Sequence, residues 1–319
     1  MRHRCAILDD YQNVALSLAD WTSVKMDADI TVFTEPLGGK LAETLRDFSI
    51  LCLMRERTLF DRAAIDALPN LKLLVTSGMR NAAIDIKAAA SRNIPVCGTE
   101  SIGTPTAELT FGLMLELTRK IGFENARLKA GAPWQSTLGT ELAGKTLGIF
   151  GLGKLGSRVA AIGSAFGMNV IAWSQNLTDE KAKAAGAKRV SKEELFRQSD
   201  FVTIHTQLSG RTRGAVGAAE FSLMKPSAYL INTSRGPIVE ESALLSALRG
   251  NKIAGAGVDV YDAEPLPLDH PLRKIDRAVI TPHLGYVTAE GYRRFYTQMA
   301  EDIRAWLDGK PIRVIPAPA

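Results

Sequence analysis

An arginine, two carboxylates and a histidine follow three apolar runs in the second half of the chain. Arg235 comes shortly after the first run, and Asp259 opens the segment after the second. Glu264 stands later in that segment, and His283 follows the third run. Ligands of open α/β sheets bind at the carboxyl ends of parallel strands, so we expect these side chains to meet at one sheet edge. A guanidinium is suited to binding anions, and an imidazole can exchange a proton near neutral pH.

A glycine-rich turn precedes these residues. The apolar run 146–150 leads into the sequence GLGKLG at 151–156, and an amphipathic stretch follows. The first glycine permits a tight turn, the second lets backbone approach a pyrophosphate, and the third lets helix and strand pack closely. The helix N-terminus offers N–H groups to phosphates. The sequence therefore predicts a dinucleotide site, with cofactor contacts at Gly151, Gly153, Lys154, Leu155 and Gly156.

The run 169–173 is expected to end in an acidic residue that binds the adenosine ribose. It ends instead in Ser174, followed by Gln175 and Asn176. The missing acid removes the repulsion that would exclude a 2′-phosphate, yet no arginine or lysine stands beside Ser174 to bind one. We expect NAD as the cofactor and leave NADP open.

Four motifs in order resemble those of the D-isomer-specific 2-hydroxyacid dehydrogenases, a family that includes formate, phosphoglycerate and glycerate dehydrogenases. They are G-x-G-x-x-G, N-T-S-R-G around Arg235, D-V-x-x-x-E-P from Asp259, and T-P-H-x-G around His283. The likeness extends over nearly the whole chain. It implies an NAD(P)-dependent enzyme that transfers a hydride between a nicotinamide cofactor and a small anionic D-2-hydroxy acid or 2-keto acid.

The resemblance also implies a role for each matching residue. Arg235 binds the carboxylate and 2-oxygen of the substrate, and His283 exchanges a proton with that oxygen. Glu264 hydrogen-bonds His283, which favours the imidazolium and orients the ring. Asp259 binds the nicotinamide carboxamide. The further cofactor contacts that it implies are Thr106, Ser174, Thr206, Thr233 and His283.

The substrate loop departs from the family pattern, which usually reads G-x-G-x-D-x-x-D. The chain has GMRNAAID at 78–85, so Arg80 replaces the second glycine and Ala82 the first aspartate. Substrate contacts are expected at Met79, Arg80 and Asn81. Arg80 either binds an acidic group of the substrate or points to solvent. Gln207 also stands where proline is common, so we expect a divergent branch of the family.

Apolar runs alternate with amphipathic segments in two series, which is typical of parallel α/β sheets. We expect two doubly wound domains, a Rossmann cofactor domain (101–287) inserted into a flavodoxin-like substrate domain (1–100 and 288–319). One long helix over 105–129, capped by Thr104, separates the series. A final helix over 288–307 returns to the first domain, and the tail 311–319 is expected to be loosely structured. The expected strands are 5–8, 30–33, 50–53, 71–76, 94–97, 146–150, 169–173, 201–205, 228–232, 253–258 and 278–281.

Composition limits the remaining possibilities. Apolar residues make up 46% and charged residues 23% of the 319 residues, as in ordinary globular proteins. No apolar run is long enough to span a membrane, and no secretory leader is visible. The net charge of +5 is dispersed, which argues against nucleic-acid binding. Cys5, Cys52 and Cys97 have no metal-binding spacing, so we expect buried, reduced thiols, no metal site and a cytoplasmic protein.

Two further expectations concern assembly and an alternative function. We expect a homodimer, formed through apolar residues of the long helix: Leu109, Phe111, Leu113, Met114 and Leu117. The same fold occurs in transcriptional corepressors that sense the dinucleotide, but their peptide-binding features are not found here.

We expect structural roles for the remaining histidines, including a packed or backbone-supporting His205.

Overall fold

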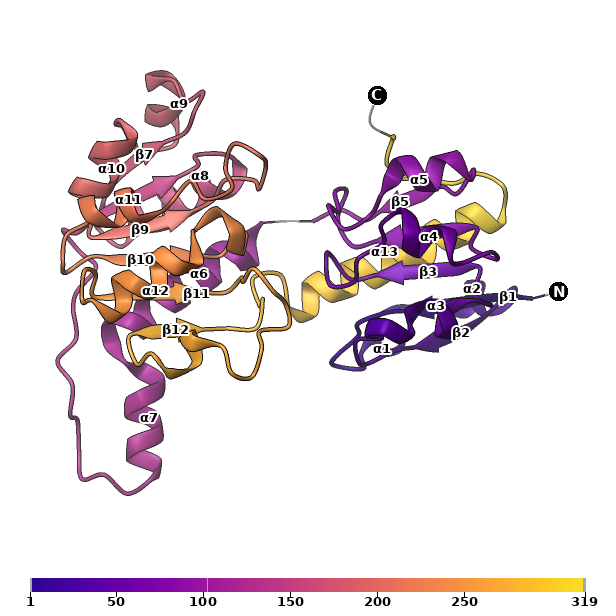
Figure 1. Ribbon diagram of the computed structural model, residues 1–319, viewed down its shortest axis with the longest axis horizontal. Coiled ribbons are helices and arrows are strands. Elements are labelled where there is room, and N and C mark those ends of the chain that lie inside the picture. Colours follow the sequence, from indigo (N-terminus) through magenta and orange to yellow (C-terminus); the bar gives the residue numbers. More distant parts are fainter. Residues whose placement is uncertain (1, 102, 318–319) are drawn as a thin grey trace. The chain divides into compact units, whose positions relative to one another are not determined.

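The computed structural model describes residues 2–101 and 103–317, which form two compact units. The first unit comprises Met1–Ile102 and Thr288–Ala319, and the second comprises Gly103–Val287. The chain therefore leaves the first unit, builds the second and returns. Each unit has its own parallel sheet (Figure 1). Each also has its own clusters of buried apolar side chains.

The first unit contains a five-stranded sheet in the order β2-β1-β3-β4-β5, with every neighbouring pair parallel. This order is that of flavodoxin-like folds. Its central strands β3 and β4 are buried along their whole length, as expected for strands covered on both faces. The strands are β1 (His3–Ile7), β2 (Ala28–Val32), β3 (Ile50–Leu53), β4 (Leu73–Thr76) and β5 (Val96–Gly98).

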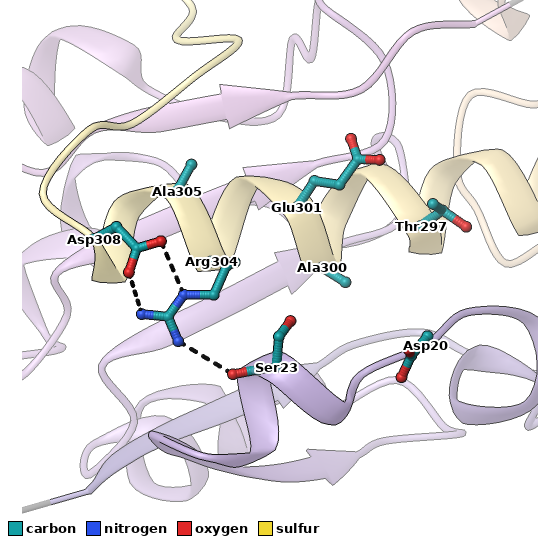
Figure 2. A pocket seen from close by; sticks show the side chains of 8 residues that line it. All are labelled: Asp20, Ser23, Thr297, Ala300, Glu301, Arg304, Ala305 and Asp308. Carbon is teal, nitrogen blue, oxygen red and sulfur yellow. Dashed lines mark hydrogen bonds and ion pairs between the residues drawn. The ribbon is translucent and has the colours of Figure 1, made fainter.

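Helix α13 (Ala289–Leu307) packs along this sheet against β4 and β5, and also against α1 and α2 (Figure 1). Arg304 on α13 donates to the Ser23 carbonyl (Figure 2). It also donates to Asp27, and the two bonds tie the helix to the α2 region. A cavity of about 360 Å³ lies beside this contact, lined by Asp20, Glu301 and Asp308 among others. The other helices of the unit are α1 (Ala15–Leu18), α2 (Thr22–Lys25), η1 (Gly38–Lys40), α3 (Leu41–Leu45), α4 (Arg62–Asp66) and α5 (Ile86–Ser91).

The second unit contains a seven-stranded parallel sheet in the order β12-β11-β10-β9-β6-β7-β8. Numbered within the unit, its first six strands have the 3-2-1-4-5-6 order of the dinucleotide-binding fold. The expected fold class is therefore confirmed, although the short strand β8 was not expected from the sequence. The strands are β6 (Thr146–Phe150), β7 (Asn169–Trp173), β8 (Lys188–Arg189), β9 (Phe201–Ile204), β10 (Tyr229–Asn232), β11 (Gly255–Val258) and β12 (Ala278–Ile280).

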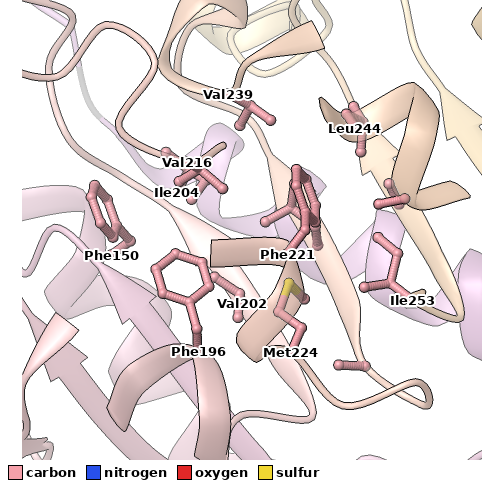
Figure 3. Packing of buried hydrophobic residues seen from close by; sticks show 14 of the residues in the cluster. Phe150, Phe196, Val202, Ile204, Val216, Phe221, Met224, Val239, Leu244 and Ile253 are labelled. Carbon is pink, nitrogen blue, oxygen red and sulfur yellow. The ribbon is translucent and has the colours of Figure 1, made fainter. Parts of the chain in front are cut away.

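One face of this sheet is covered by a large apolar cluster (Figure 3). Phe150, Phe196 and Phe221 lie within it, and all three side chains are almost wholly buried. This core holds β6, β9 and β10 in place, and those strands carry the loops described below. The helices of the unit are α6 (Thr104–Arg119), α7 (Ile121–Lys129), α8 (Lys154–Ala165), α9 (Asp179–Ala184), α10 (Lys192–Gln198), α11 (Ala218–Leu223), η2 (Gly236–Ile238), α12 (Glu241–Arg249) and η3 (Pro271–Lys274).

The single helix expected over 105–129 is wrong, because two helices occupy that segment. Lys120 has a φ of 53°, in the left-handed region, and separates α6 from α7. The Thr118 carbonyl accepts from the Thr140 N–H, while the Gly122 N–H donates to the Glu116 carboxylate. These two bonds replace the one that would continue the helix between Thr118 and Gly122. The expected cap was also misplaced, because Gly103 is the N-cap and Thr104 the first helical residue.

The tail is better ordered than expected over 313–315, whereas residues 318–319 lie outside the described residues. Gly98 donates to the Arg313 carbonyl, and the Ile315 N–H donates to the Val96 carbonyl. Arg313 donates to the buried Asp302 at 2.9 Å and to Glu301 at 2.8 Å. The tail thus covers the edge strand β5, because its arginine is held by α13.

The three cysteines are free and buried. Of the part of the chain that the structure describes, no helix is long and apolar enough to cross a bilayer.

Asp302 makes the stability of the first unit depend on pH. Its Oδ2 is buried without a hydrogen-bond partner among the described residues, and burial raises its pKa from 3.8 to about 7 despite the charge of Arg313. The folded state therefore keeps a proton that the unfolded chain releases at lower pH. Relative to Asp302→Asn, the wild type should lose unfolding free energy as the pH rises from about 4 to about 7, with no further loss above that range.

Denaturant unfolding across this pH range measures the difference. Asp308→Asn is the control, because Asp308 is exposed and pairs with Arg304 on the same helix. A pH-independent gap between the wild type and Asp302→Asn would contradict the assignment.

Candidate active site

The glycine-rich turn connects β6 to α8 and depends on two close approaches. Gly151 has a φ of +107°, and a Cβ there would lie 2.7 Å from the His205 carbonyl carbon. A Cβ on Gly156 would lie 2.2 Å from the Gly151 oxygen. By contrast, a Cβ on Gly153 would meet no atom of the described residues within 4 Å, and no side chain caps α8. Open space before an uncapped helix N-terminus fits a pyrophosphate.

His205 supports this turn from the neighbouring strand end. The backbone N–H of His205 donates to the Phe150 carbonyl at 2.8 Å. Both ring nitrogens are buried and lack a hydrogen-bond partner among the residues described, and burial lowers the pKa of the imidazole to about 3. The ring is therefore neutral at ordinary pH, which fits a packing role.

Ser174 lies directly against the glycine-rich turn. Its Oγ accepts a hydrogen bond of 2.7 Å from the Leu152 N–H. Lys154 is exposed at the start of α8, whereas Leu155 is partly buried and lies near Gly103. The structure thus places the expected cofactor residues of 151–156 and Ser174 around one turn.

His283 and Glu264 are in direct contact. The His283 Nδ1 and Glu264 Oε2 lie 2.6 Å apart, and neither side chain is fully buried. The Tyr261 N–H donates to the other oxygen of Glu264 at 2.9 Å. The carboxylate is therefore held on one side by backbone and presents its second oxygen to the imidazole.

Asp259 anchors the loop that carries His283. Its Oδ1 accepts from Thr281 Oγ1 at 2.6 Å and from the Leu284 N–H at 2.7 Å. Its Oδ2 accepts from the Gly285 N–H at 2.9 Å. Burial raises the pKa of Asp259, although these hydrogen bonds and the charge of His283 oppose the rise. The Asp259 carboxylate therefore holds residues on both sides of His283 in the sequence.

Thr106 joins α6 to the same loop, because its Oγ1 donates to the Gly285 carbonyl at 2.6 Å. Thr233 is buried after β10, and its hydroxyl lies 3.0 Å from that of Thr110 on α6. The first turns of α6 therefore contact the segments after both β10 and β12.

The Arg235 segment is shaped by its own backbone contacts. Asn232 Nδ2 donates to the Arg235 carbonyl at 3.0 Å, and Arg235 Nη1 donates to the Ser234 carbonyl at 2.7 Å. The Ser234 hydroxyl donates to the Thr206 carbonyl, which links this segment to the one after β9. A Cβ on Gly236 would lie 2.1 Å from the Tyr261 carbonyl carbon. The segments that carry Arg235 and Glu264 are thus in direct contact.

Tyr261 is a structural residue of this site that sequence analysis missed. Its hydroxyl oxygen lies 2.8 Å from the Thr281 carbonyl oxygen and 3.0 Å from the Val258 carbonyl oxygen, so its single hydrogen is shared between these two acceptors. It therefore joins the ends of β11 and β12 in addition to holding Glu264. Its position within D-V-x-x-x-E-P was the signal that could have identified it.

The expected substrate loop belongs to the first unit. Met79 and Arg80 are exposed there, but Asn81 is buried. Asn81 Nδ2 donates to the Arg55 carbonyl at 2.6 Å and to Thr76 Oγ1 at 2.9 Å, and its Oδ1 accepts from the Ala83 N–H at 2.9 Å. The Asn81 side chain thus braces the loop.

Arg55 also lies against this loop, since a Cβ on Gly78 would fall 2.2 Å from its Nη1. Its position just after the apolar run 50–53 was a signal that we did not use. Within the described ranges, no three histidine, cysteine or acidic side chains are grouped so as to hold a metal ion.

Comparison with known proteins identifies the family. The NAD binding domain model of the D-isomer specific 2-hydroxyacid dehydrogenases matches residues 111–285, more than half of the chain. The chain belongs to this family. The resemblance stated from the sequence is confirmed, and the chain is an NAD-linked D-2-hydroxyacid dehydrogenase in the general sense of that family.

Individual relatives agree with this membership. A glyoxylate reductase of Aeropyrum pernix is 39% identical over 264 residues, which cover 79% of each chain. A D-3-phosphoglycerate dehydrogenase of Methanocaldococcus jannaschii is 36% identical over 88% of this chain, which spans only 54% of that longer protein. The crystal structure of a phosphoglycerate oxidoreductase from Vibrio cholerae has a TM-score of 0.91 and 35% identity, covering 96% of this dehydrogenase and 99% of that chain.

Substitutions of two glycines in the turn should have different effects on this dehydrogenase. Gly156→Ala should lower the free energy of unfolding by roughly 1–3 kcal/mol, because its Cβ would press on the Gly151 carbonyl. Gly153→Ala should leave stability nearly unchanged but weaken NADH binding, because its Cβ would enter the open space. Thermal unfolding and NADH fluorescence titration measure the two effects. Equal behaviour of the two variants would contradict this reading of the turn.

Proposed function

We propose that Arg235, Glu264 and His283 catalyse the interconversion of a small D-2-hydroxy acid and its 2-keto acid. In this proposal the second unit binds NAD, and the first unit, with Met79, Arg80 and Asn81, forms the substrate domain. The observation that carries the proposal is the 2.6 Å contact between Glu264 and His283. When bound, the nicotinamide supplies or accepts the hydride.

The contact with Glu264 determines which imidazole nitrogen of His283 exchanges a proton with the substrate. Because the carboxylate accepts from Nδ1, the proton exchanged with substrate is carried by Nε2. In keto-acid reduction His283 donates this proton to the carbonyl oxygen, and in oxidation it takes the proton back. The negative charge of Glu264 stabilises the imidazolium and holds the ring plane.

Arg235 supplies the positive charge for the substrate. Its guanidinium binds a carboxylate and the adjacent 2-oxygen with parallel donors, a geometry that a lysine lacks. The contact of Gly236 with Tyr261 supports this role, because it holds the Arg235 segment against the segment of Glu264. We further propose that Thr106, Ser174, Thr206, Thr233 and Asp259 hold the cofactor with residues 151–156.

Steady-state kinetics with glyoxylate, hydroxypyruvate and pyruvate tests this assignment. His283→Ala should lower kcat by on the order of 10²–10⁴-fold, because general acid catalysis is lost. Arg235→Lys should raise KM and lower kcat, and Glu264→Gln should mainly lower kcat. NADH binding should survive all three changes, because the glycine-rich turn is untouched.

His270→Ala is a matched control. His270 Nε2 lies 3.1 Å from Glu241 Oε2, so it forms a second histidine–carboxylate pair outside the proposed catalytic set. Its replacement should change kcat by less than about tenfold. Near-normal turnover in His283→Ala would disprove the assigned mechanism. A wild type without turnover of any keto acid would favour a dinucleotide-sensing protein.

We also propose a homodimer, but through a different surface from the one expected. Phe111, Leu113, Met114 and Leu117 are buried in the core of the second unit, so they cannot meet a partner. Residues 121–140, here called the arm, project from this unit (Figure 1). The nine-residue helix α7 in the arm has no buried residue, and such short helices are marginal without packing. Large apolar residues exposed in the arm are Ile121, Phe123, Leu128, Trp134 and Leu138.

The mass of the protein in solution tests whether the arm forms a dimer interface. At micromolar concentration the wild type should have twice the mass of one chain by light scattering. The double change Phe123→Ser and Trp134→Ser should shift it toward the monomer. Leu268→Ser is the control, because Leu268 is also an exposed apolar residue of the second unit but lies outside the arm. A monomeric wild type would refute the proposal.

A further inference from the structure

The end of β7 carries a neutral residue at a position where charge distinguishes the two nicotinamide cofactors. Ser174 follows the last residue of β7, and its Oγ accepts from the Leu152 N–H of the glycine-rich turn. In the dinucleotide-binding fold, an acidic residue at this place binds the ribose 2′-hydroxyl. The hydrogen bond to Leu152 shows that Ser174 occupies that place in space as well as in sequence.

We propose that Ser174 makes this enzyme accept both NAD and NADP, so that the ribose site binds either a 2′-hydroxyl or a 2′-phosphate. The proposal rests on the proposed function of the second unit as the cofactor domain. It goes further by naming the residue that sets the selectivity for the phosphate.

The chemistry of a hydroxyl differs from that of a carboxylate at this position. Ser174 Oγ accepts one backbone N–H and still carries a hydrogen that it can donate to a ribose or a phosphate oxygen. A carboxylate could accept from the same N–H and from ribose hydroxyls, but it would repel a phosphate. With serine at this position, the negative charge that normally excludes NADP is absent, while the hydrogen bond to the glycine-rich turn is kept.

The residues that follow Ser174 in the chain add no positive charge that would favour the phosphate. Gln175 and Asn176 are neutral and exposed, so they offer amide donors but no positive charge. The next acidic residue along the chain, Asp179, lies 3.7 Å from Arg189, so its charge is offset. We therefore expect dissociation constants for NADH and NADPH within about tenfold of each other.

Substitution of Ser174 by two residues of one shape isolates the charge. Ser174→Asp and Ser174→Asn both keep an acceptor for the Leu152 N–H, and only the first adds a negative charge. Ser174→Asp should weaken NADPH binding by on the order of 10²-fold relative to NADH. Ser174→Asn should leave the ratio of the two dissociation constants within about threefold of the wild type.

Fluorescence titration of the full-length protein with NADH and with NADPH, without substrate, gives these ratios. The wild-type ratio decides the proposal even if a variant fails to fold: NADPH binding that is 100-fold or more weaker would overturn it. Equal ratios in the two folded variants would overturn it as well.

The same titration separates this inference from the proposed catalytic function. His283→Ala should keep the wild-type ratio. A wild-type protein that turns over none of the keto acids, yet shows the expected binding ratios, would refute the catalytic proposal and support the inference.

Discussion

The buried carboxylate of Asp259 is the interaction on which the rest of the site depends. It accepts three hydrogen bonds from the segment 281–285, on both sides of His283. A carboxylate that is buried and ionised requires such donors, because desolvation alone disfavours its charge. The same segment receives the Thr106 hydroxyl of α6, so the position of the imidazole is defined by β11 and by α6 together.

Close backbone contacts hold the neighbouring segments to this anchor. Gly236 lies so near Tyr261 that no side chain fits between them, and Tyr261 in turn binds Glu264 and the end of β12. The glycine-rich turn is held by a similar contact, because Gly151 lies directly against the backbone of His205. Segments that follow different strands are therefore in direct contact, and in the proposed mechanism a proton donor held in this way needs little reorganisation during reaction.

Several structural outcomes required particular side-chain and backbone contacts that the hydrophobic pattern of the sequence does not reveal. The break at Lys120 depends on Thr140 and Glu116 taking the two groups that would otherwise continue α6. The ordering of the tail depends on Arg313 reaching Asp302. Apolar periodicity cannot distinguish a helix face that packs in its own core from one that awaits a partner, and so the dimer surface was first assigned to α6.

The sequence by itself determined the fold class and the family, and it supplied the residues of the proposed catalytic set. Continuous apolar runs specify buried parallel strands, and motif residues at their ends specify chemistry at one sheet edge. Only the tertiary structure decided how those groups are held: that Asp259 anchors the loop, that Asn81 braces its own segment and that the Ser174 hydroxyl accepts from the glycine-rich turn. The reason is physical, since hydrogen bonds act over about 3 Å between atoms that the order of residues does not bring together.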